Sequence, residues 1–242
     1  MEKPLARSRA ADRTPTAAAS AAPAAEKRPR GRPRKTIDER DDGNRRVELV
    51  NAAARLFRRK GFEATSTRDI AAAVGMHSGS PFYHFKSKGA LLHAVMDEGM
   101  RNAIARQAAA LDVAAASAPD ALALLQVLIR NHFDVLLGPG SDFIPVMLYE
   151  SRSITAKQRT ALARLQGDYE ARWEPVLQAL HKQGQLKAPV KLARLLIFGA
   201  LNWSVQWFDA KKGASLDELA EAAMSLFMAS APELKATRKH TP

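Results

Sequence analysis

Hydrophobic side chains recur every three or four positions along most of the chain after residue 43, which is the spacing of one buried helix face. Nowhere do apolar and polar residues alternate over the length of a strand, so the pattern predicts an all-α protein. About nine helices are expected, over residues 47–60, 68–74, 78–85, 87–111, 120–137, 142–152, 156–182, 190–210 and 216–230. Pro175 is expected to kink or loosen the helix that contains it.

The first three predicted helices are short and are joined by turns that contain glycine. Gly61 ends the first, because glycine readily takes the left-handed conformation found after a helix. Ser66 or Thr67 offers a hydroxyl to cap the second, and Gly75 begins the turn into the third. Two short helices joined in this way are typical of a helix-turn-helix DNA-binding unit. The first helix has its predicted buried stripe at Val47, Val50, Ala54 and Phe57.

The third helix carries side chains that suit a DNA surface better than a protein core. The Ser-Gly-Ser run at 78–80 is small enough for the backbone to approach a phosphate or a base edge closely. Tyr83, His84 and Lys86 offer hydrogen-bond donors, and the aromatic rings offer apolar contact to thymine methyl groups. Pro81 is tolerated because it falls in the first turn, where its missing N–H has no helical partner. The alternative is a small helical core segment with exposed polar residues.

These residues resemble the DNA-binding motif of the TetR family of bacterial transcription regulators. The resemblance lies in Thr67, Arg68, Ile70, Ala71 and Gly75, followed by the run SGSPFYHFKSK over residues 78–88. It implies an N-terminal three-helix DNA-binding domain and a larger helical domain for ligand binding and dimerisation. The residues expected at the DNA are Ser66, Thr67, Arg68, Ser78, Gly79, Ser80, Phe82, Tyr83, His84, Lys86 and Lys88.

Within that set, the resemblance implies that Ser66, Thr67, Arg68 and Lys88 contact phosphates. The residues implied in or beside the major groove are Ser78, Ser80, Phe82, Tyr83 and His84. Phe85 matches a position that packs beneath the DNA-reading helix. Two positions depart from the family's usual pattern, since Phe82 stands where a tyrosine is common and Pro81 where an aliphatic residue is common.

The charge of the chain adds a polyanionic partner to this picture. The formal net charge is +12 over 242 residues, which favours nucleic acid. There is no cysteine, which excludes disulfides and thiolate metal sites, and the six histidines have no metal-binding spacing. No cofactor or metal is therefore expected. No apolar run of eighteen or more residues occurs, so a soluble, cytoplasmic protein without a membrane partner is expected.

The N-terminal segment 1–43 has almost no bulky apolar residues and is predicted to be a disordered basic tail. Its residues 27–35 read KRPRGRPRK and resemble an AT-hook, which inserts Arg30, Gly31 and Arg32 into a narrow minor groove. The alternative is a generic polybasic arm held near DNA by counterion release. The expected domains are 44–92 for DNA binding and 93–232 for ligand binding and dimerisation, with a disordered tail at 233–242.

Two C-terminal segments are predicted to form an interface between two copies of the chain. Residues 192–208 are apolar nearly all round, and the helix at 216–230 has one broad apolar stripe. A symmetric dimer also follows from function, because one recognition helix reads too few base pairs, whereas a pair reads a palindromic operator. The alternative is that both helices belong to the core of one monomer.

The other helices of the C-terminal domain are expected to enclose a small organic effector. The run at 199–208 is similar to a subset of the TetR family that responds to acyl-CoA thioesters. Each candidate has ordinary core packing as its alternative role. The candidate lining residues are Phe133, Phe143, Met147, Tyr149, Trp173, Asn202, Trp203, Gln206 and Trp207.

These features predict a homodimeric repressor that a small hydrophobic effector, an acyl-CoA among the candidates, releases from double-stranded DNA. Activation of transcription is the alternative sign of regulation. An architectural binder of A·T-rich DNA, led by the basic tail, is a rival of another class. An enzyme is not expected, because Glu150, Arg152 and His132 are the only candidate cluster and no nucleophile stands beside a base at a diagnostic spacing.

Overall fold

The structure is a computed structural model in which residues 42–77 and 81–228 are described, and they form ten α-helices and three short 3₁₀ helices. These residues contain no strand, which confirms the all-α prediction. The chain divides after residue 40, and the described residues all lie in the part that follows. The predicted C-terminal tail and nearly all of the predicted N-terminal tail are outside the described residues.

Helix α1 spans Asp42–Lys60 and begins before the predicted start at residue 47, inside the segment assigned to the tail. The predicted burial of Val47 is wrong, since its side chain is 55% exposed. The predicted burial of Val50, Ala54 and Phe57 is confirmed, and Leu49 and Ala53 are fully buried beside them. Helix α1 ends at Gly61, which turns the chain at φ +81° and donates its N–H to the Phe57 carbonyl at 2.8 Å.

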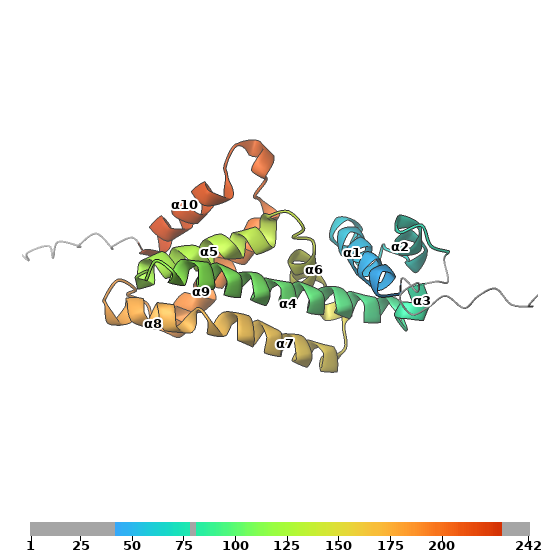
Figure 1. Cartoon of the computed structure of the whole chain (residues 1–242), viewed down its shortest axis with the longest axis horizontal. Helices are drawn as coiled ribbons and strands as arrows, with labels where there is room; N and C mark the ends of the chain where they lie inside the picture. Colours follow the sequence, from blue (N-terminus) through green and yellow to red (C-terminus); the bar gives the residue numbers. More distant parts are fainter. Residues whose placement is uncertain (1–41, 78–80, 229–242) are drawn as a thin grey trace, which may run out of the picture. The chain divides into compact units, whose positions relative to one another are not determined.

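The second and third short helices follow, with α2 at Thr67–Ala73 and α3 at Pro81–His84. The longest helix, α4, packs against α1, α5, α6 and α7 and so joins the N-terminal helices to the rest of the fold (Figure 1). Helices α8 and α10 pack on α5, and α9 packs on α8. The bounds of these helices are α4 Lys88–Ala115, α5 Ala121–Leu137, α6 Phe143–Glu150, α7 Ala156–Ala171, α8 Glu174–Lys182, α9 Val190–Trp203 and α10 Leu216–Met228.

One predicted helix is divided in two, which is why ten helices are found where about nine were expected, and another is shortened. The predicted helix at 156–182 is two helices, and α8 begins just before Pro175, which takes a first-turn position where its missing N–H is harmless. The predicted helix at 190–210 ends at Trp203 and continues as a 3₁₀ helix over Ser204–Gln206.

The hydrophobic core has two clusters that meet along α4 and α5. The first joins α1, α2 and Phe85, the residue after α3, to α4, α6 and α7, and includes Ile70 and Met96. The second joins α5, α8, α9 and α10 around Trp173. Because the first cluster runs without a break from the N-terminal helices to α6 and α7, a displacement of one group of helices is transmitted to the other.

Helix α6 approaches α4 closely at Gly99. A Cβ atom built on Gly99 would lie 2.6 Å from the Cβ of Phe143, far inside van der Waals contact. Only glycine therefore lets the first turn of α6 rest on α4 at this distance.

Candidate DNA-binding surface and effector cavity

Helix α2 begins with a reciprocal cap that fixes where the predicted phosphate-contacting residues lie. The Ser66 hydroxyl accepts a hydrogen bond from the Asp69 N–H at 3.1 Å, and the Asp69 carboxylate accepts one from the Ser66 N–H at 2.9 Å. The Asp69 carboxylate also accepts a hydrogen bond from the Ser66 hydroxyl at 2.8 Å, and the hydrogen bonds from the Ser66 N–H and hydroxyl hold the pKa of Asp69 below its usual value. Thr67 is the first helical residue, and Arg68 is exposed beside it.

Helix α3 presents its side chains outward at Tyr83, which is 94% exposed. His84 is half-buried and Lys86 is exposed, whereas Phe85 is buried, as its position in the TetR motif implies. The helix begins at Pro81, which needs no helical hydrogen-bond acceptor for its nitrogen. Ser78, Gly79, Ser80 and the side chain of Phe82 lie outside the described residues, so their predicted DNA contacts stay predictions.

The cationic side chains of Lys88 and Arg46 contact backbone carbonyls and aromatic rings next to the short N-terminal helices. The Lys88 ammonium donates to the carbonyls of Phe62 and Glu63 at 2.8 and 3.4 Å and lies 4.2 Å from the centre of the Phe62 ring. The Arg46 guanidinium lies 4.9 Å from the centre of the Phe85 ring. Lys88 therefore has a structural role that the sequence motif does not indicate, and its predicted phosphate contact stays a prediction.

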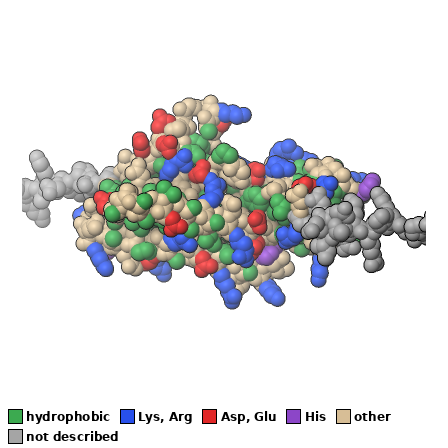
Figure 2. Space-filling view, in the orientation of Figure 1, with side chains coloured by type: hydrophobic (Ala, Val, Ile, Leu, Met, Phe, Trp, Pro, Cys, Tyr) green, Lys and Arg blue, Asp and Glu red, His purple; other side chains and the backbone are tan. Residues whose placement is uncertain are grey.

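The AT-hook-like segment, with Arg30, Gly31 and Arg32, lies outside the described residues. On the face drawn in Figure 2, Lys and Arg side chains lie both on the DNA-reading helices and on the larger domain. Positive charge alone therefore does not distinguish a DNA-binding surface from the rest of this face.

A cavity of about 420 Å³, counting its opening to solvent, lies inside the larger domain. Helices α4, α5, α6, α7 and α9 all contribute to its wall. Its apolar lining includes Met100, Val135, Ile144, Met147, Leu148 and Phe198. Its polar lining is His132, Gln166, Tyr169, Glu170 and Asn202. Mostly apolar walls with a few polar groups suit a small organic ligand.

The polar groups in this wall form a buried cluster around His132. One ring nitrogen, Nδ1, lies 3.0 Å from the Tyr169 hydroxyl, and the other, Nε2, lies 3.1 Å from the Asn202 side-chain oxygen. The rings of Trp173 and Phe198 face the imidazole edge-on at 5.9 and 5.1 Å. Burial lowers the pKa of His132 to about 4 against the opposing effect of the Asn202 hydrogen bond, so the imidazole is neutral at physiological pH.

The cavity includes two of the predicted ligand residues, Met147 and Asn202. Phe133 and Trp173 are core residues of the second cluster, and Phe143 lines a different cavity. Tyr149, Trp203 and Trp207 are more than half exposed, and the exposed Gln206 donates a hydrogen bond to the Tyr149 hydroxyl. Sequence reasoning missed Tyr169 and Phe198 and considered His132 only as part of an enzyme site.

The candidate enzyme cluster is not assembled. His132 bonds to Tyr169 and Asn202, whereas the Glu150 carboxylate accepts hydrogen bonds from the Phe62 N–H at 2.8 Å and from the Ser153 hydroxyl at 3.3 Å. Glu150 therefore belongs to a contact between α6 and the loop that precedes α2.

Residues at the two ends of α6 contact α1 and the loop between α1 and α2. Before its start, Ser141 and Asp142 accept hydrogen bonds from the Arg58 guanidinium of α1 at 3.3 and 3.2 Å. At its end, the Glu150 carboxylate accepts a hydrogen bond from the N–H of Phe62. An outer cavity lies between α1, α4 and α6 and includes Arg46 and Arg106. Val135 and Ile144 line both this outer cavity and the cavity around His132, which is the inner cavity.

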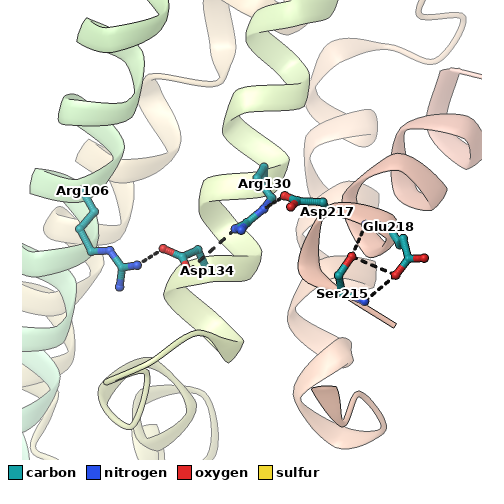
Figure 3. Close-up of polar contacts among 6 residues, drawn as sticks. All are labelled: Arg106, Arg130, Asp134, Ser215, Asp217 and Glu218. Carbon is teal, nitrogen blue, oxygen red and sulfur yellow. Dashed lines mark hydrogen bonds and ion pairs between the residues drawn. The ribbon is translucent and has the colours of Figure 1, made fainter. Parts of the chain in front are cut away.

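Helices α9 and α10 expose an apolar surface. Along α9, the side chains of Leu192, Leu195, Leu196 and Trp203 are each more than half exposed. Leu195 and Leu196 follow Leu192 by three and four residues, and Trp203 follows Leu196 by two helical turns, so all four lie on one face. Leu226 on α10 is 79% exposed. Helix α10 is tied to the rest of the domain by a chain of ion pairs from Arg106 through Asp134 and Arg130 to Asp217 (Figure 3).

Comparison with known proteins agrees with this architecture at both ends of the chain. The sequence model described as "Bacterial regulatory proteins, tetR family" matches residues 49–95, and the one described as "Tetracyclin repressor-like, C-terminal domain" matches residues 118–231. The chain belongs to the TetR family. It is a DNA-binding transcriptional regulator with its helix-turn-helix in the N-terminal domain. A model described as "AT hook motif" also matches residues 27–39.

Relatives of known structure or function extend over most of the chain. The HTH-type transcriptional repressor KstR2 of Rhodococcus jostii (strain RHA1) is 28% identical over 79% of this chain and 93% of its own. The superantigen PfiT is 37% identical, with a TM-score of 0.63, over 77% of this chain and 97% of its own. AibR, solved in complex with isovaleryl coenzyme A and operator DNA, is 21% identical, with a TM-score of 0.68, over 76% of this chain and 98% of its own. At this identity, the similarity to AibR shows a shared fold alone.

In the described part of the chain, every helix is too short or too polar to cross a membrane.

Proposed function

We propose that this TetR-family protein is a homodimeric repressor that binds a palindromic operator and is released from it by a small hydrophobic effector. The observation that carries the proposal is the double role of α6. This helix supplies Ile144, Met147 and Leu148 to the inner cavity and contacts the loop between α1 and α2 through Glu150. A ligand that displaces the cavity wall therefore displaces the support of α1 and α2. Its site of action is the bacterial chromosome in the cytoplasm.

The exposed face of α9 supports the homodimer. Four large apolar side chains, Leu192, Leu195, Leu196 and Trp203, lie on one helix face with more than half of each exposed. Contiguous apolar surface of this kind is costly in water and marks an interface. A second copy related by twofold symmetry buries the face and sets two recognition helices roughly one duplex turn apart.

Repression follows from occupancy, because a dimer seated on a promoter blocks polymerase without a further partner. The effector class we propose is a short-chain acyl thioester. KstR2 is named a repressor, and AibR was solved with an acyl-CoA and operator DNA, which supports this choice. The apolar lining of the inner cavity suits an acyl chain, with the rest of the thioester outside it.

Fluorescence anisotropy tests the proposal directly. The full chain is bound to labelled DNA taken from beside its own gene and titrated with acyl-CoA thioesters and the matching free acids. Release at micromolar thioester, with a preference for one chain length, is the expected result. Tight binding without release by any thioester would contradict the proposed effector class and leave the DNA-binding function in place.

A second candidate function is an architectural binder of A·T-rich DNA, which the AT-hook match over residues 27–39 favours. The two functions differ in what residues 1–41 contribute. A chain lacking them keeps palindrome recognition if it is a specific regulator, and loses most of its affinity if the arm dominates. The matched comparison is binding to the palindrome and to an A·T-rich duplex without a palindrome, at the same salt concentration.

A further inference from the structure

The inner cavity is built around a polar group whose protons can be assigned. The Asn202 side-chain oxygen is a hydrogen-bond acceptor, so the His132 nitrogen beside it at 3.1 Å must carry the proton. In a neutral imidazole the other nitrogen is then an acceptor, and the Tyr169 hydroxyl donates to it at 3.0 Å. Both nitrogens of His132 are thus satisfied within the protein.

Some neutral hydrogen-bonding groups of this cluster stay available to a ligand in the cavity wall. The amide N–H groups of Asn202 have no partner among the described residues. The Tyr169 oxygen keeps its lone pairs, since its proton is used on His132. A ligand in the cavity therefore meets an amide donor at Asn202 and an acceptor at Tyr169, and both lie beside apolar surface.

No cation is available to a ligand there. Among the described residues, the lining contains neither lysine nor arginine, and its one carboxylate, Glu170, is paired with Arg194. Arg106, which acts electrostatically on Tyr169, lines the outer cavity and is paired with Asp134. A carboxylate in the inner cavity would lose its hydration without gaining a counter-charge, and would lie near Glu170.

We infer that the inner cavity selects an apolar ligand with a neutral carbonyl head, as in a ketone, ester or thioester, and rejects the carboxylate of the same chain length. The carbonyl oxygen accepts from the Asn202 amide, and the chain lies against Met147, Ile144 and Phe198. This inference rests on the proposed function, because it assigns the effector to the inner cavity.

Calorimetric titration of the full chain without DNA tests the inference with a matched pair of probes, 2-nonanone and nonanoate. We expect the ketone to bind on the order of a hundredfold more tightly, since an unpaired buried charge costs several kcal/mol. Nonanoate that binds as tightly as the ketone would overturn the inference, and so would a failure of both probes to bind.

Two variants then locate the carbonyl contact. Asn202→Leu has nearly the same shape and lacks the amide donor, and we expect it to weaken 2-nonanone binding about tenfold. Asn102→Leu is the control, because Asn102 lines only the outer cavity. A loss in the Asn102 variant alone would overturn the assignment to the inner cavity. Circular dichroism verifies that both variants fold, and the wild-type probe pair decides selectivity even if one does not.

Operator release measured in parallel separates this inference from the proposed function. Selective ketone binding without release of DNA supports the inference and contradicts ligand control of transcription. Release by nonanoate but not by 2-nonanone supports ligand control and overturns the inference.

Discussion

The His132 imidazole is enclosed by aromatic rings and has no charged partner, so protonating it in the folded protein is costly. Its pKa falls from 6.5 to about 4 because burial excludes water from the charged form. Between these two pH values the unfolded chain binds a proton that the folded chain does not, so the free energy of unfolding falls as the pH is lowered from 6.5 to 4. We expect His132 to account for a loss of about 3 kcal/mol over this interval.

Urea unfolding of the wild type and of His132→Gln at several pH values measures that contribution. The variant is expected to be less stable at pH 7, because its amide does not reproduce both hydrogen bonds. Its stability is also expected to fall less steeply in acid. Parallel pH profiles of the two proteins would mean that His132 does not titrate as its burial requires.

Tyr83 is the residue at which DNA contact and stability separate most cleanly. Its side chain is 94% exposed, so Tyr83→Ala removes almost no packing. We expect an unchanged melting temperature and a loss of about 1 to 3 kcal/mol of binding free energy on the operator, with relaxed base preference. Anisotropy on operator and random duplexes tests this, and equal losses on the two would remove Tyr83 from the base-reading residues.

The burial pattern of the helix-turn-helix motif was predictable from sequence, whereas the lining of the inner cavity was not. Tyr83 and Phe85 belong to a motif whose spacing assigns one to solvent and the other to the core, and the structure agrees. Trp203 and Trp207 have apolar side chains without such a motif. Periodicity says only that such a side chain seeks cover, and both are exposed on the surface of the monomer. His132 carries no motif either, and its role comes from Tyr169 and Asn202, which are distant in sequence.

At the scale of elements, the position of α6 depends on Gly99. Gly99→Ala places a methyl group against Phe143, where the Cβ atoms would be 2.6 Å apart, so α6 must move away from α4. We expect a loss of about 1 to 3 kcal/mol of unfolding free energy, the usual cost of overpacking. Gly167→Ala is the matched control, since the added Cβ in α7 meets no atom within 4 Å. It should stabilise the protein by about 0.5 to 1 kcal/mol, because alanine favours a helix.

Thermal unfolding of the two alanine variants tests whether Gly99→Ala lowers the free energy of unfolding and Gly167→Ala raises it. A Gly99 variant as stable as the Gly167 variant would mean that the close approach of α6 to α4 is absent in solution.

The contact between Glu150 and the Phe62 N–H is the expected route from the inner cavity to the DNA. Glu150→Ala removes this acceptor without altering any residue of the cavity lining. We expect unchanged effector affinity without DNA, and a coupling between effector and DNA that is weaker by about tenfold. The measurement is effector affinity with and without operator, and Glu63→Ala, an exposed neighbour of Phe62, is the control. Unchanged coupling in the Glu150 variant would mean that the signal passes through other contacts, such as α4 or the Arg58 contact before α6.

The existence of the helices follows from apolar spacing, but their ends and their partners depend on packing. The segment 156–182 has one continuous helical pattern, yet it divides before Glu174, next to the fully buried Trp173. The indole N–H of Trp173 donates to the side-chain oxygen of the buried Gln107 on α4 at 2.9 Å, in the amide orientation that satisfies both groups. No local pattern in the sequence indicates a contact between residues so far apart.

At the scale of the whole molecule, the exposed face of α9 decides whether one chain suffices to bind the operator. Leu196 is 67% exposed near the middle of this face, so Leu196→Glu should leave the folded monomer intact and put two charges against each other in a symmetric interface. We expect a monomer by analytical ultracentrifugation and loss of palindrome binding, because a single recognition helix reads too few base pairs. Val113→Glu is the control, since Val113 is a 77% exposed apolar residue on α4, outside the α9 face. If both variants sediment as dimers, the interface lies elsewhere. If the Leu196 variant is a monomer that still binds the palindrome with full affinity, the operator does not require the symmetric pair.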